Sequence, residues 1–367
     1  MKKRVAAVIT EFWDICHADV IITKMLEGFR LDGRLYRSTL EIAAIYVDQF
    51  PENDLSRELA AKHGIPILPS IRETLLVGSD SFDIDGILII GEHGDYLDNE
   101  IGQTLYPRRR FFEECLNVML EFDRIVPVFS DKGFAVIQED IAWMYGQIKT
   151  RQIPFMSSSV VPYSRTRPSV EPFPAGSPLH KMFGFAYGPL ERYMYHTIEM
   201  MQSVGERRAC GESGIRSVRA YKGKAAIAQL LSEDWNGLYR TLGGFINLRD
   251  LDAFPDEVIE PAFVEIYYAD GLRSGIATSN PEVLTFASAY QVYAHESPIC
   301  REFLLQGQKP YIHFGRLVLE IEKFIHTRNP PHAFERSLLT AGALDACMRS
   351  LASGGEAIDT PHLLVQY

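Results

Sequence analysis

The sequence lacks several features that would quickly assign it to a class. Its five cysteines among 367 residues are scattered, odd in number and without CxxC spacing, which argues against a disulfide framework or a cysteine metal site. No apolar run reaches the roughly 18–20 residues of a membrane helix, and we interpret the start, MKKRVAAVIT, as a strand and not a signal peptide. The net charge of −11 argues against nucleic acid or an anionic membrane as a partner. We therefore expect a cytoplasmic globular protein.

The first turn lacks the glycines that its surroundings predict. Residues 4–10 are almost entirely apolar, which is typical of a short strand buried on both faces. Apolar residues then recur at helical spacing over 21–29. This strand–turn–helix opening is that of a nucleotide-binding βαβ unit, but its turn contains Glu11, Trp13 and Asp14 where glycine is expected.

The first 160 residues alternate short apolar runs with helical patterns, which predicts a parallel sheet with right-handed crossovers. We expect strands at 4–10, 41–48, 66–69, 86–91, 124–130 and 153–159, and helices at 55–64, after a Ser70–Glu73 capping box, at 111–122 and around 141–148. Ligands bind beyond the carboxyl ends of such strands. The segments expected at that edge are 11–14, Asp48, 92–96 and 130–132.

The second half has a different pattern. Residues 160–180 are rich in proline and serine and predict a long loop, whereas alternation over 263–271 and 273–279 predicts antiparallel strands. Helices are expected at 190–203, 223–232, 314–326 and 335–351. We predict an α/β chain with a Rossmann-like, doubly wound parallel sheet over 1–150. An α+β domain with a large, mostly antiparallel open sheet follows over 151–367, and its tail helix could pack back on the first domain.

Five segments, in order, resemble one family of enzymes. They are AAIYVDQFPENDLSRELAAKHGIPI, GILIIGEHGDY, VFSDKGFA, YMYHTIE and ERSLLTAGALDACMRSL. They resemble the second strand and helix, the fourth strand and substrate loop, the Glu-Lys-Pro segment, the G-x-H-x-x-D helix and the C-terminal helix of the Gfo/Idh/MocA family, which includes glucose–fructose oxidoreductase and inositol dehydrogenase. The resemblance covers most of the chain. It implies a Rossmann domain followed by an α+β domain whose sheet often forms the oligomer interface, and hence a homo-oligomer (dimer or tetramer) with a sugar-like substrate.

The resemblance also implies roles for particular residues. Asp48 would hydrogen-bond the adenosine ribose, and as an acid it favours NAD over NADP. Lys132, beside Asp131, would orient the substrate hydroxyl and tune proton transfer, with His196 as general base or proton relay. Glu199, which replaces the family's aspartate, would hold the substrate or the histidine. The residues alone leave an alternative for each of these roles. Asp48 could be a carboxylate that caps the loop, Lys132 a surface lysine paired with Asp131, and His196 a structural histidine.

The family's glycine motif is where this sequence departs from the pattern. Its three glycines fall on Ile9, Glu11 and Asp14. Glycines there permit the tight turn and the close approach of the pyrophosphate to the helix N-terminus. Side chains would obstruct that approach, and two carboxylates would repel a diphosphate although a helix N-terminus favours them. The candidate cofactor contacts at this edge are Asp48, Thr10, Glu11, Phe12 and Glu92.

Four polar side chains follow the apolar run 86–91, where the family has a neutral, proline-containing loop. Glu92, His93 and Asp95 are weak candidates for a divalent metal site, or could act as acid and base, with His93 catalytic. Asp95 and Tyr96 are candidate substrate contacts. The alternative is a loop whose acids cap the following helix.

Arginines and one further histidine are ambiguous. Arg165 and Arg167 lie where the family places part of its substrate wall and could fix an acidic sugar. Residues 108–110 are three arginines, for which a solvated helix face is the preferred interpretation. His17 is expected to be structural, with metal ligation beside the acids of the first turn as the alternative.

Three functions remain open. The first is an oxidoreductase that transfers hydride between a nicotinamide and a sugar, cyclitol or related polyol, with Lys132 and His196 handling the proton. The second is a lyase, isomerase or hydrolase of a sugar-like compound that does not use a dinucleotide, with or without a metal. The third is a non-catalytic sensor or assembly subunit. Fold alone cannot choose among them.

Overall fold

The chain folds into two compact units whose segments interleave in the sequence. The computed structural model describes residues 2–186, 188–248, 251, 261–278, 283–293 and 295–367. The first unit contains the chain up to Asp98, Thr104–Val160 and Gln306–Phe334. The second contains Asn99–Gln103, Val161–Leu305 and Glu335–Tyr367. The main crossing at residues 160–161 lies near the predicted boundary at 150, but the segment 306–334 returns to the first unit.

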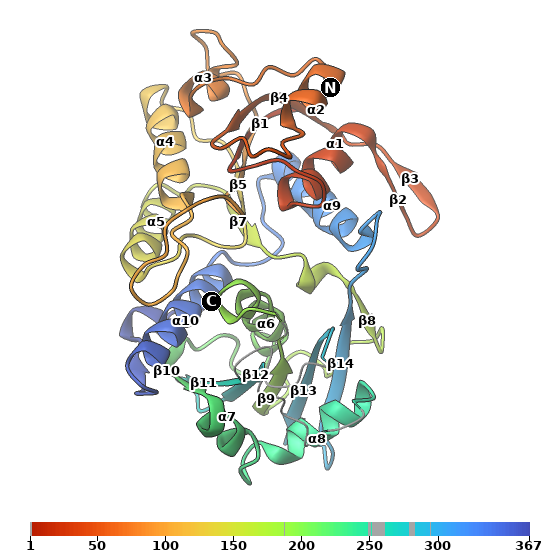
Figure 1. Cartoon of the computed structure of the whole chain (residues 1–367), viewed down its shortest axis with the longest axis vertical. Helices are drawn as coiled ribbons and strands as arrows, with labels where there is room; N and C mark the ends of the chain where they lie inside the picture. The colour runs from red at the N-terminus through yellow and green to blue at the C-terminus, as the bar shows by residue number, and fades with distance from the viewer. Residues whose placement is uncertain (1, 187, 249–250, 252–260, 279–282, 294) are drawn as a thin grey trace. The chain divides into compact units, whose positions relative to one another are not determined.

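A five-stranded parallel sheet forms the centre of the first unit (Figure 1). Its strands, in spatial order, are β4 (Leu40–Val47), β1 (Lys3–Ile9), β5 (Gly86–Ile90), β6 (Val128–Asp131) and β7 (Phe155–Ser158). The interior strands are apolar on both faces because helices cover both sides. The strand predicted at 66–69 is reduced to one parallel bridge between Ile45 and Ile67.

Helices and one hairpin complete the first unit. They are η1 (Asp19–Thr23), α1 (Lys24–Glu27), β2 (Phe29–Leu31), β3 (Arg34–Tyr36), α2 (Ser56–His63), α3 (Ile71–Leu76), α4 (Arg108–Glu121), α5 (Gln138–Thr150) and α9 (Ile312–Thr327). The predicted cap of α3 is confirmed, since the Ser70 side chain accepts from the Glu73 amide. The helix predicted at 21–29 is instead a π-helical turn followed by α1. It stops at Gly28, where φ is +79° and a Cβ would lie 2.5 Å from the Tyr36 carbonyl oxygen.

An eight-stranded sheet forms the second unit. Its order is β15 (Ile358–Asp359), β10 (Ile215–Lys222), β11 (Ala262–Tyr268), β12 (Arg273–Ala277), β9 (Leu179–Phe185), β13 (Phe286–Val292), β14 (Ile299–Leu304) and β8 (Arg165–Arg167). Neighbouring strands are antiparallel except β9 and β12. The mostly antiparallel sheet was predicted correctly. The loop predicted at 160–180 was not, because it contains η2 (Val161–Tyr163), β8 and the first residues of β9.

Helices pack on this sheet. They are α6 (Leu190–Gly205), α7 (Gly223–Leu230), α8 (Asn236–Phe245), α10 (Glu335–Ala352) and the short η3 (Pro361–Leu363). Trp235 and Tyr239 are fully buried in a core cluster that also contains Phe183 and Phe263 of the sheet. The tail helix α10 packs against β10 and α6, all within the second unit.

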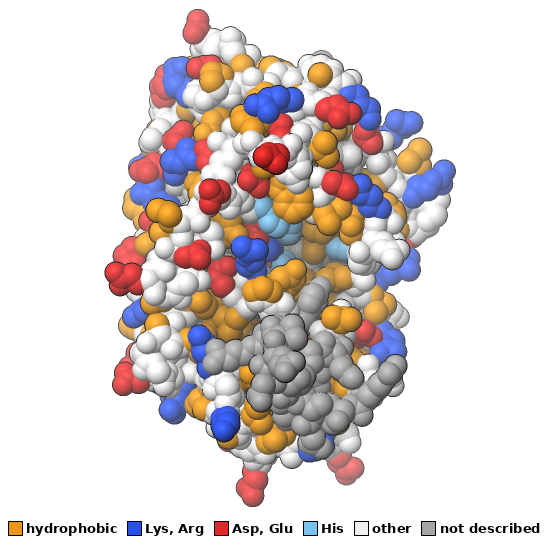
Figure 2. All heavy atoms as spheres, in the orientation of Figure 1, with side chains coloured by type: hydrophobic (Ala, Val, Ile, Leu, Met, Phe, Trp, Pro, Cys, Tyr) orange, Lys and Arg blue, Asp and Glu red, His pale blue; other side chains and the backbone are white. Residues whose placement is uncertain are grey.

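In the described part of the chain, no helix is long and apolar enough to cross a membrane. On the face shown in Figure 2, acidic and basic side chains are interspersed.

Candidate functional site

A buried ionic network lies at the carboxyl edge of the first unit's sheet. Glu92, just after β5, accepts from Lys132 Nζ at 2.7 Å and from an Arg108 guanidinium nitrogen at 2.6 Å. All three residues are at least nine-tenths buried. Burial by itself raises the pKa of Glu92, but the charges of Lys132 and Arg108 outweigh it and hold that pKa well below its usual range. Glu92 is therefore an ionised carboxylate between two buried cations.

The turn after β6 fixes Lys132 in this network. Lys132 has φ of +54° and Gly133 φ of +100°, so the chain makes a left-handed turn directly after the strand. The Ser130 hydroxyl donates to the Gly133 carbonyl, and the Gly133 amide donates to Ser157 Oγ at 2.7 Å. Glycine at 133, where the family has proline, supplies an amide for this bond and tolerates the positive φ.

Asp131 and His17 form a second pair at the same edge. Their closest atoms, Asp131 Oδ2 and His17 Nδ1, lie 2.6 Å apart, and Asp131 is fully buried. The alternative of a surface lysine paired with Asp131 is not what the structure shows, because Lys132 is buried and binds Glu92 while Asp131 binds His17. His17 was expected to be structural. Its bond to a buried carboxylate is the arrangement that orients an imidazole for proton transfer.

Aromatic rings fill the space between the loops after β1 and β5. The ring centroid of His93 lies 5.0 Å from that of Trp13 and 5.7 Å from that of His17. His93 has a positive φ of +69°. Burial, reinforced by the nearby charge of His17, lowers the pKa of His93 to about 4. His93 is therefore neutral near pH 7 and can accept or donate one hydrogen bond without carrying charge.

Asp48, after β4, is held by three neighbours. It accepts from the hydroxyls of Tyr46 at 2.6 Å and Tyr96 at 2.8 Å, and pairs with Arg110 at 2.5 Å. Burial raises its pKa, but these hydrogen bonds outweigh that effect and lower it. The predicted site residues Asp48 and Tyr96 thus lie together. Asp95 is exposed, and its backbone is bonded to the Gln49 side chain.

The first turn does not fit the diphosphate of a dinucleotide in the usual pose. The Ile15 amide donates to an Asp19 carboxylate oxygen at 3.0 Å, and the amides of Trp13 and Asp19 donate to the Cys16 sulfur. These are amides of the segment that would cradle phosphate oxygens. Their acceptors are supplied by the chain, and the Trp13 indole bonds Glu11 beside them.

The remaining contacts of the turn are internal as well. Thr10 is fully buried and its hydroxyl donates to the Glu92 carbonyl at 2.6 Å. Phe12 is buried in the core, and its carbonyl accepts from the Leu55 amide. Thr10 and Phe12 therefore hold the turn in place.

The weak metal candidates are not brought together. Among the residues that the structure describes, no group of three or more His, Cys, Asp or Glu side chains could hold a metal ion. Glu92 and Asp95 do not converge on one point, because both carboxylate oxygens of Glu92 bind the cations Lys132 and Arg108 while Asp95 is exposed. The described residues therefore give no support to a metal site made of Glu92, His93 and Asp95.

In the second unit, α6 carries both predicted residues. His196 is 7% exposed and lies 5.6 Å, between ring centroids, from Phe286. Glu199 is fully buried one turn later. Burial by itself lowers the pKa of Arg336, but the hydrogen bond and charge of Glu206, followed by the charge of Glu199, outweigh it and raise that pKa. A neighbouring arginine thus balances the buried acid.

The arginines at 108–110 do not form the solvated helix face that was the preferred interpretation, and those at 165 and 167 lie on the edge strand β8. Arg108 is not on a solvated face but buried against Glu92, and Arg110 binds Asp48. Arg109 stacks on Trp143. Arg167, proposed as a substrate contact, pairs with Glu302 at 2.8 Å across neighbouring strands, and Arg165 is exposed on β8.

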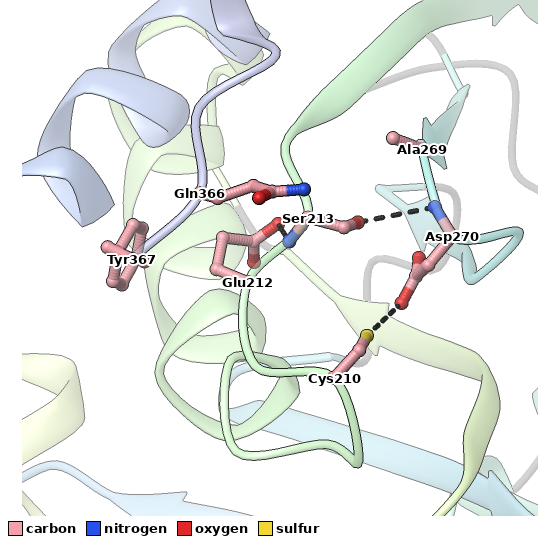
Figure 3. Close-up of a pocket in the computed structure, with 7 residues that line it drawn as sticks. All are labelled: Cys210, Glu212, Ser213, Ala269, Asp270, Gln366 and Tyr367. Carbon is pink, nitrogen blue, oxygen red and sulfur yellow. Dashed lines mark hydrogen bonds between the residues drawn. The ribbon is translucent and has the colours of Figure 1, made fainter.

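A cavity in the second unit is a weaker candidate. It has a volume of about 470 Å³ and is lined by Cys210, Glu212, Ser213, Ala269, Asp270, Gln366 and Tyr367 (Figure 3). Both acids bind Arg208. Figure 3 shows the Cys210 thiol directed at Asp270, their atoms 2.9 Å apart. Burial and this hydrogen bond raise the pKa of Cys210, so the thiol is a poor nucleophile.

Two residues of the first unit's network were missed as site residues from sequence. Arg108 belongs to a run of three arginines, and only packing shows which one turns inward. His17 has no local pattern that links it to Asp131, which lies 114 residues later.

Comparison with known proteins identifies the fold. No protein-family model matches the chain. No curated protein matches it either. Among solved structures, GenD2 from gentamicin A biosynthesis in complex with NAD is 12% identical, with 98% of this chain and 97% of that one covered and a TM-score of 0.59. The myo-inositol 2-dehydrogenase of Lactobacillus plantarum is 10% identical, with 98% and 99% covered and a TM-score of 0.58.

A third structure agrees with these two. The myo-inositol dehydrogenase of Corynebacterium glutamicum is 12% identical, with 98% of this chain and 99% of that one covered and a TM-score of 0.59. The neighbours are inositol dehydrogenases and related Gfo/Idh/MocA-type oxidoreductases. The resemblance predicted from five segments is therefore confirmed at the level of the fold, over nearly the whole chain.

Proposed function

We propose that this protein is an oxidoreductase acting on a sugar, cyclitol or related polyol, and that Lys132 handles the proton of the reacting hydroxyl. One observation carries the proposal: a buried lysine, oriented by Glu92, stands at the carboxyl edge of a sheet whose whole fold is that of sugar and cyclitol dehydrogenases. Ligands bind at this edge in open α/β sheets.

The chemistry of Lys132 follows from its partner. In the direction of oxidation the hydroxyl proton passes to a base, for which the family resemblance offers His196, while the Lys132 ammonium donates a hydrogen bond to the same oxygen and stabilises the negative charge that develops there. Glu92 holds the amine in one place, and Arg108 keeps Glu92 ionised. The family resemblance adds His196 and Glu199 of α6 as proton relay and its support. We keep these as proposals, together with Asp95, Tyr96, Arg165 and Arg167 as substrate contacts.

The residues of the first turn match a nicotinamide dinucleotide less well than the rest of the fold does. A nicotinamide dinucleotide is what the fold implies, but the first turn does not fit its diphosphate, so the residues support only the proton transfer at Lys132. Asp48 favours NAD over NADP, but Arg110 beside it offsets part of that preference because an arginine accommodates a 2′-phosphate. Cytoplasmic location and a homo-oligomeric state also stay predictions.

Titration with NAD, NADH, NADP and NADPH tests the cofactor. We expect weak but measurable binding of at least one dinucleotide, with a dissociation constant of about 1 mM, because the turn's amides are occupied and Trp13 packs against His93. No binding of any of the four at millimolar concentrations would exclude the oxidoreductase. Trp13→Gly should tighten binding if this ring fills the crevice. Calorimetry and nicotinamide fluorescence give the constants. A micromolar constant for the unaltered protein would show that the turn accepts a diphosphate.

The occupied amides of the first turn keep a second function open, although the structural neighbours, which are dehydrogenases, do not favour it. A dinucleotide-independent lyase or isomerase would use the Glu92–Lys132 network and the Asp131–His17 pair for proton transfer alone. Incubating the protein with a polyol panel without any cofactor, followed by mass spectrometry for loss of water or isomerised product, distinguishes it. Product that forms only when a dinucleotide is added would exclude this second function.

A further inference from the structure

A cavity of about 320 Å³ lies in the first unit, apart from the Glu92 network. It is bordered by η1, α1, the start of the β2–β3 hairpin and the segment before α9. The residues that line it are Asp19, Val20, Thr23, Lys24, Glu27, Gly28, Phe29, Arg30, Lys309, Pro310 and Tyr311. Helix α9 packs against η1, α1 and β2, so the wall of the cavity is part of the folded core of this unit. Its volume is in the range of small-molecule sites.

Lys24 is the unusual member of this lining. It is only 9% exposed, and its Nζ donates to the Pro310 carbonyl at 2.7 Å. In the part of the chain that the structure describes, it forms no salt bridge. Both acids of the lining have other partners: Asp19 accepts from the Ile15 amide and the Thr23 hydroxyl, and Glu27 binds Lys62.

A buried ammonium without a carboxylate is costly. Burial lowers the pKa of Lys24 to about 8, against an opposing effect from Asp19. His313 nearby does not supply a second charge, because burial and Lys24 lower its pKa to about 4 and its Nδ1 accepts from the Gln306 amide. An anion beside Lys24 would offset the cost of burying its charge.

The rest of the lining selects among anions. Val20 and Phe29 are buried apolar side chains, and Tyr311 adds a half-buried ring. The other cations, Arg30 and Lys309, are exposed, and Lys309 binds Asp14. One buried cation matches one negative charge, and the apolar walls match a carbon body. A dianionic phosphate would need further donors.

We propose that this cavity binds a small organic monocarboxylate, whose carboxylate accepts from Lys24 Nζ and whose carbon body packs against Val20, Phe29 and Tyr311. The site does not depend on the proposed reaction, since none of its residues belongs to the Glu92 network. It would stand if the reaction centre proved to lie elsewhere.

Calorimetry with benzoate and with inorganic phosphate as probes tests the site. Benzoate should bind the full-length protein with a dissociation constant of about 1 mM or tighter, and Lys24→Met should weaken it at least about tenfold. Lys323→Met, an exposed lysine of α9, is the matched control and should bind benzoate normally. Phosphate should not compete. Equal benzoate binding by Lys24→Met, absence of benzoate binding, or tighter binding of phosphate would each overturn the proposal.

Protection from acetylation supplies a test that needs no variant. At pH 8 trace acetic anhydride should modify Lys24 readily, because a larger fraction of this amine is unprotonated than of an ordinary lysine. Benzoate should suppress modification of Lys24, measured by mass spectrometry, and leave Lys323 unchanged. Modification of Lys24 that benzoate does not alter would contradict the site. So would complete resistance of Lys24 in the folded protein, because the cavity would then be closed to ligands.

Discussion

Glu92→Gln is expected to lower the free energy of unfolding by about 3–5 kcal/mol. The glutamine keeps the shape of the side chain but removes the charge that Lys132 and Arg108 share, so two buried cations would face a neutral amide. Denaturant unfolding measures the change. The matched control is Glu114→Gln, which breaks a half-exposed i,i+4 pair with Arg110 and should cost about 0.3–0.5 kcal/mol. Equal losses of unfolding free energy in the two variants would mean that the buried network stabilises the protein no more than an exposed ion pair does.

The same network predicts how stability depends on pH. The pKa of Glu92 is lowered in the folded protein, so its contribution is fully present above the unfolded pKa of about 4.3. It is lost only as pH falls toward the lowered folded value. The stability difference between the unaltered protein and Glu92→Gln should therefore be constant from pH 5 to 7 and shrink in stronger acid. A difference that changed between pH 6 and 7 would point to a histidine instead.

Lys132→Met is expected to lower turnover of a polyol substrate by about 10²–10⁴-fold. Methionine fills similar volume but cannot donate a proton or stabilise an alkoxide. Lys132→Arg should not restore activity, because a planar guanidinium has a different shape and donor geometry from an ammonium. Measured as kcat/KM, the loss should appear mainly in kcat, since the interaction strengthens as charge develops on the substrate oxygen.

Much of the first unit could be predicted from its sequence. Strands buried on both faces leave continuous apolar runs, so β1, β4, β5, β6 and β7 were predicted at nearly their observed positions. Because parallel strands end at one edge, the predicted proximity of segments 92–96 and 130–132 followed from order alone, and Glu92 indeed meets Lys132. The short β8 was missed because three residues carry too little periodicity to identify a strand.

The pairing within the site could not be predicted. Asp131 and Lys132 are adjacent in sequence, and a salt bridge between them was the alternative interpretation of this lysine. In the structure the last residue of β6 and the residue after it diverge, because Lys132 has a positive φ, and each binds a partner on another segment. Which of three successive arginines faces inward depends on where α4 begins and how it packs, and only Arg108 reaches Glu92. Such choices are set by tertiary packing.

The first turn, residues 9–14, departs from the family's glycine motif in sequence and makes its own internal contacts in the structure. The sequence showed that glycine is absent at Ile9, Glu11 and Asp14. The structure shows what surrounds the turn instead: Asp19 and Cys16 accept from the turn's amides, and Trp13 packs on His93. The change is confined to this turn, since the sheet around it keeps the fold of dinucleotide-binding dehydrogenases.

We propose the Glu92–Lys132 network as the reaction centre. Turnover of a panel of cyclitols and hexoses, with each nicotinamide dinucleotide and without one, tests it most directly when the unaltered protein, Lys132→Met and Lys149→Met are compared. Lys149 is an exposed lysine of α5 in the same unit. We predict that Lys149→Met matches the unaltered protein, while Lys132→Met folds but loses at least about 100-fold in kcat. A folded Lys132→Met protein with full turnover would contradict the account.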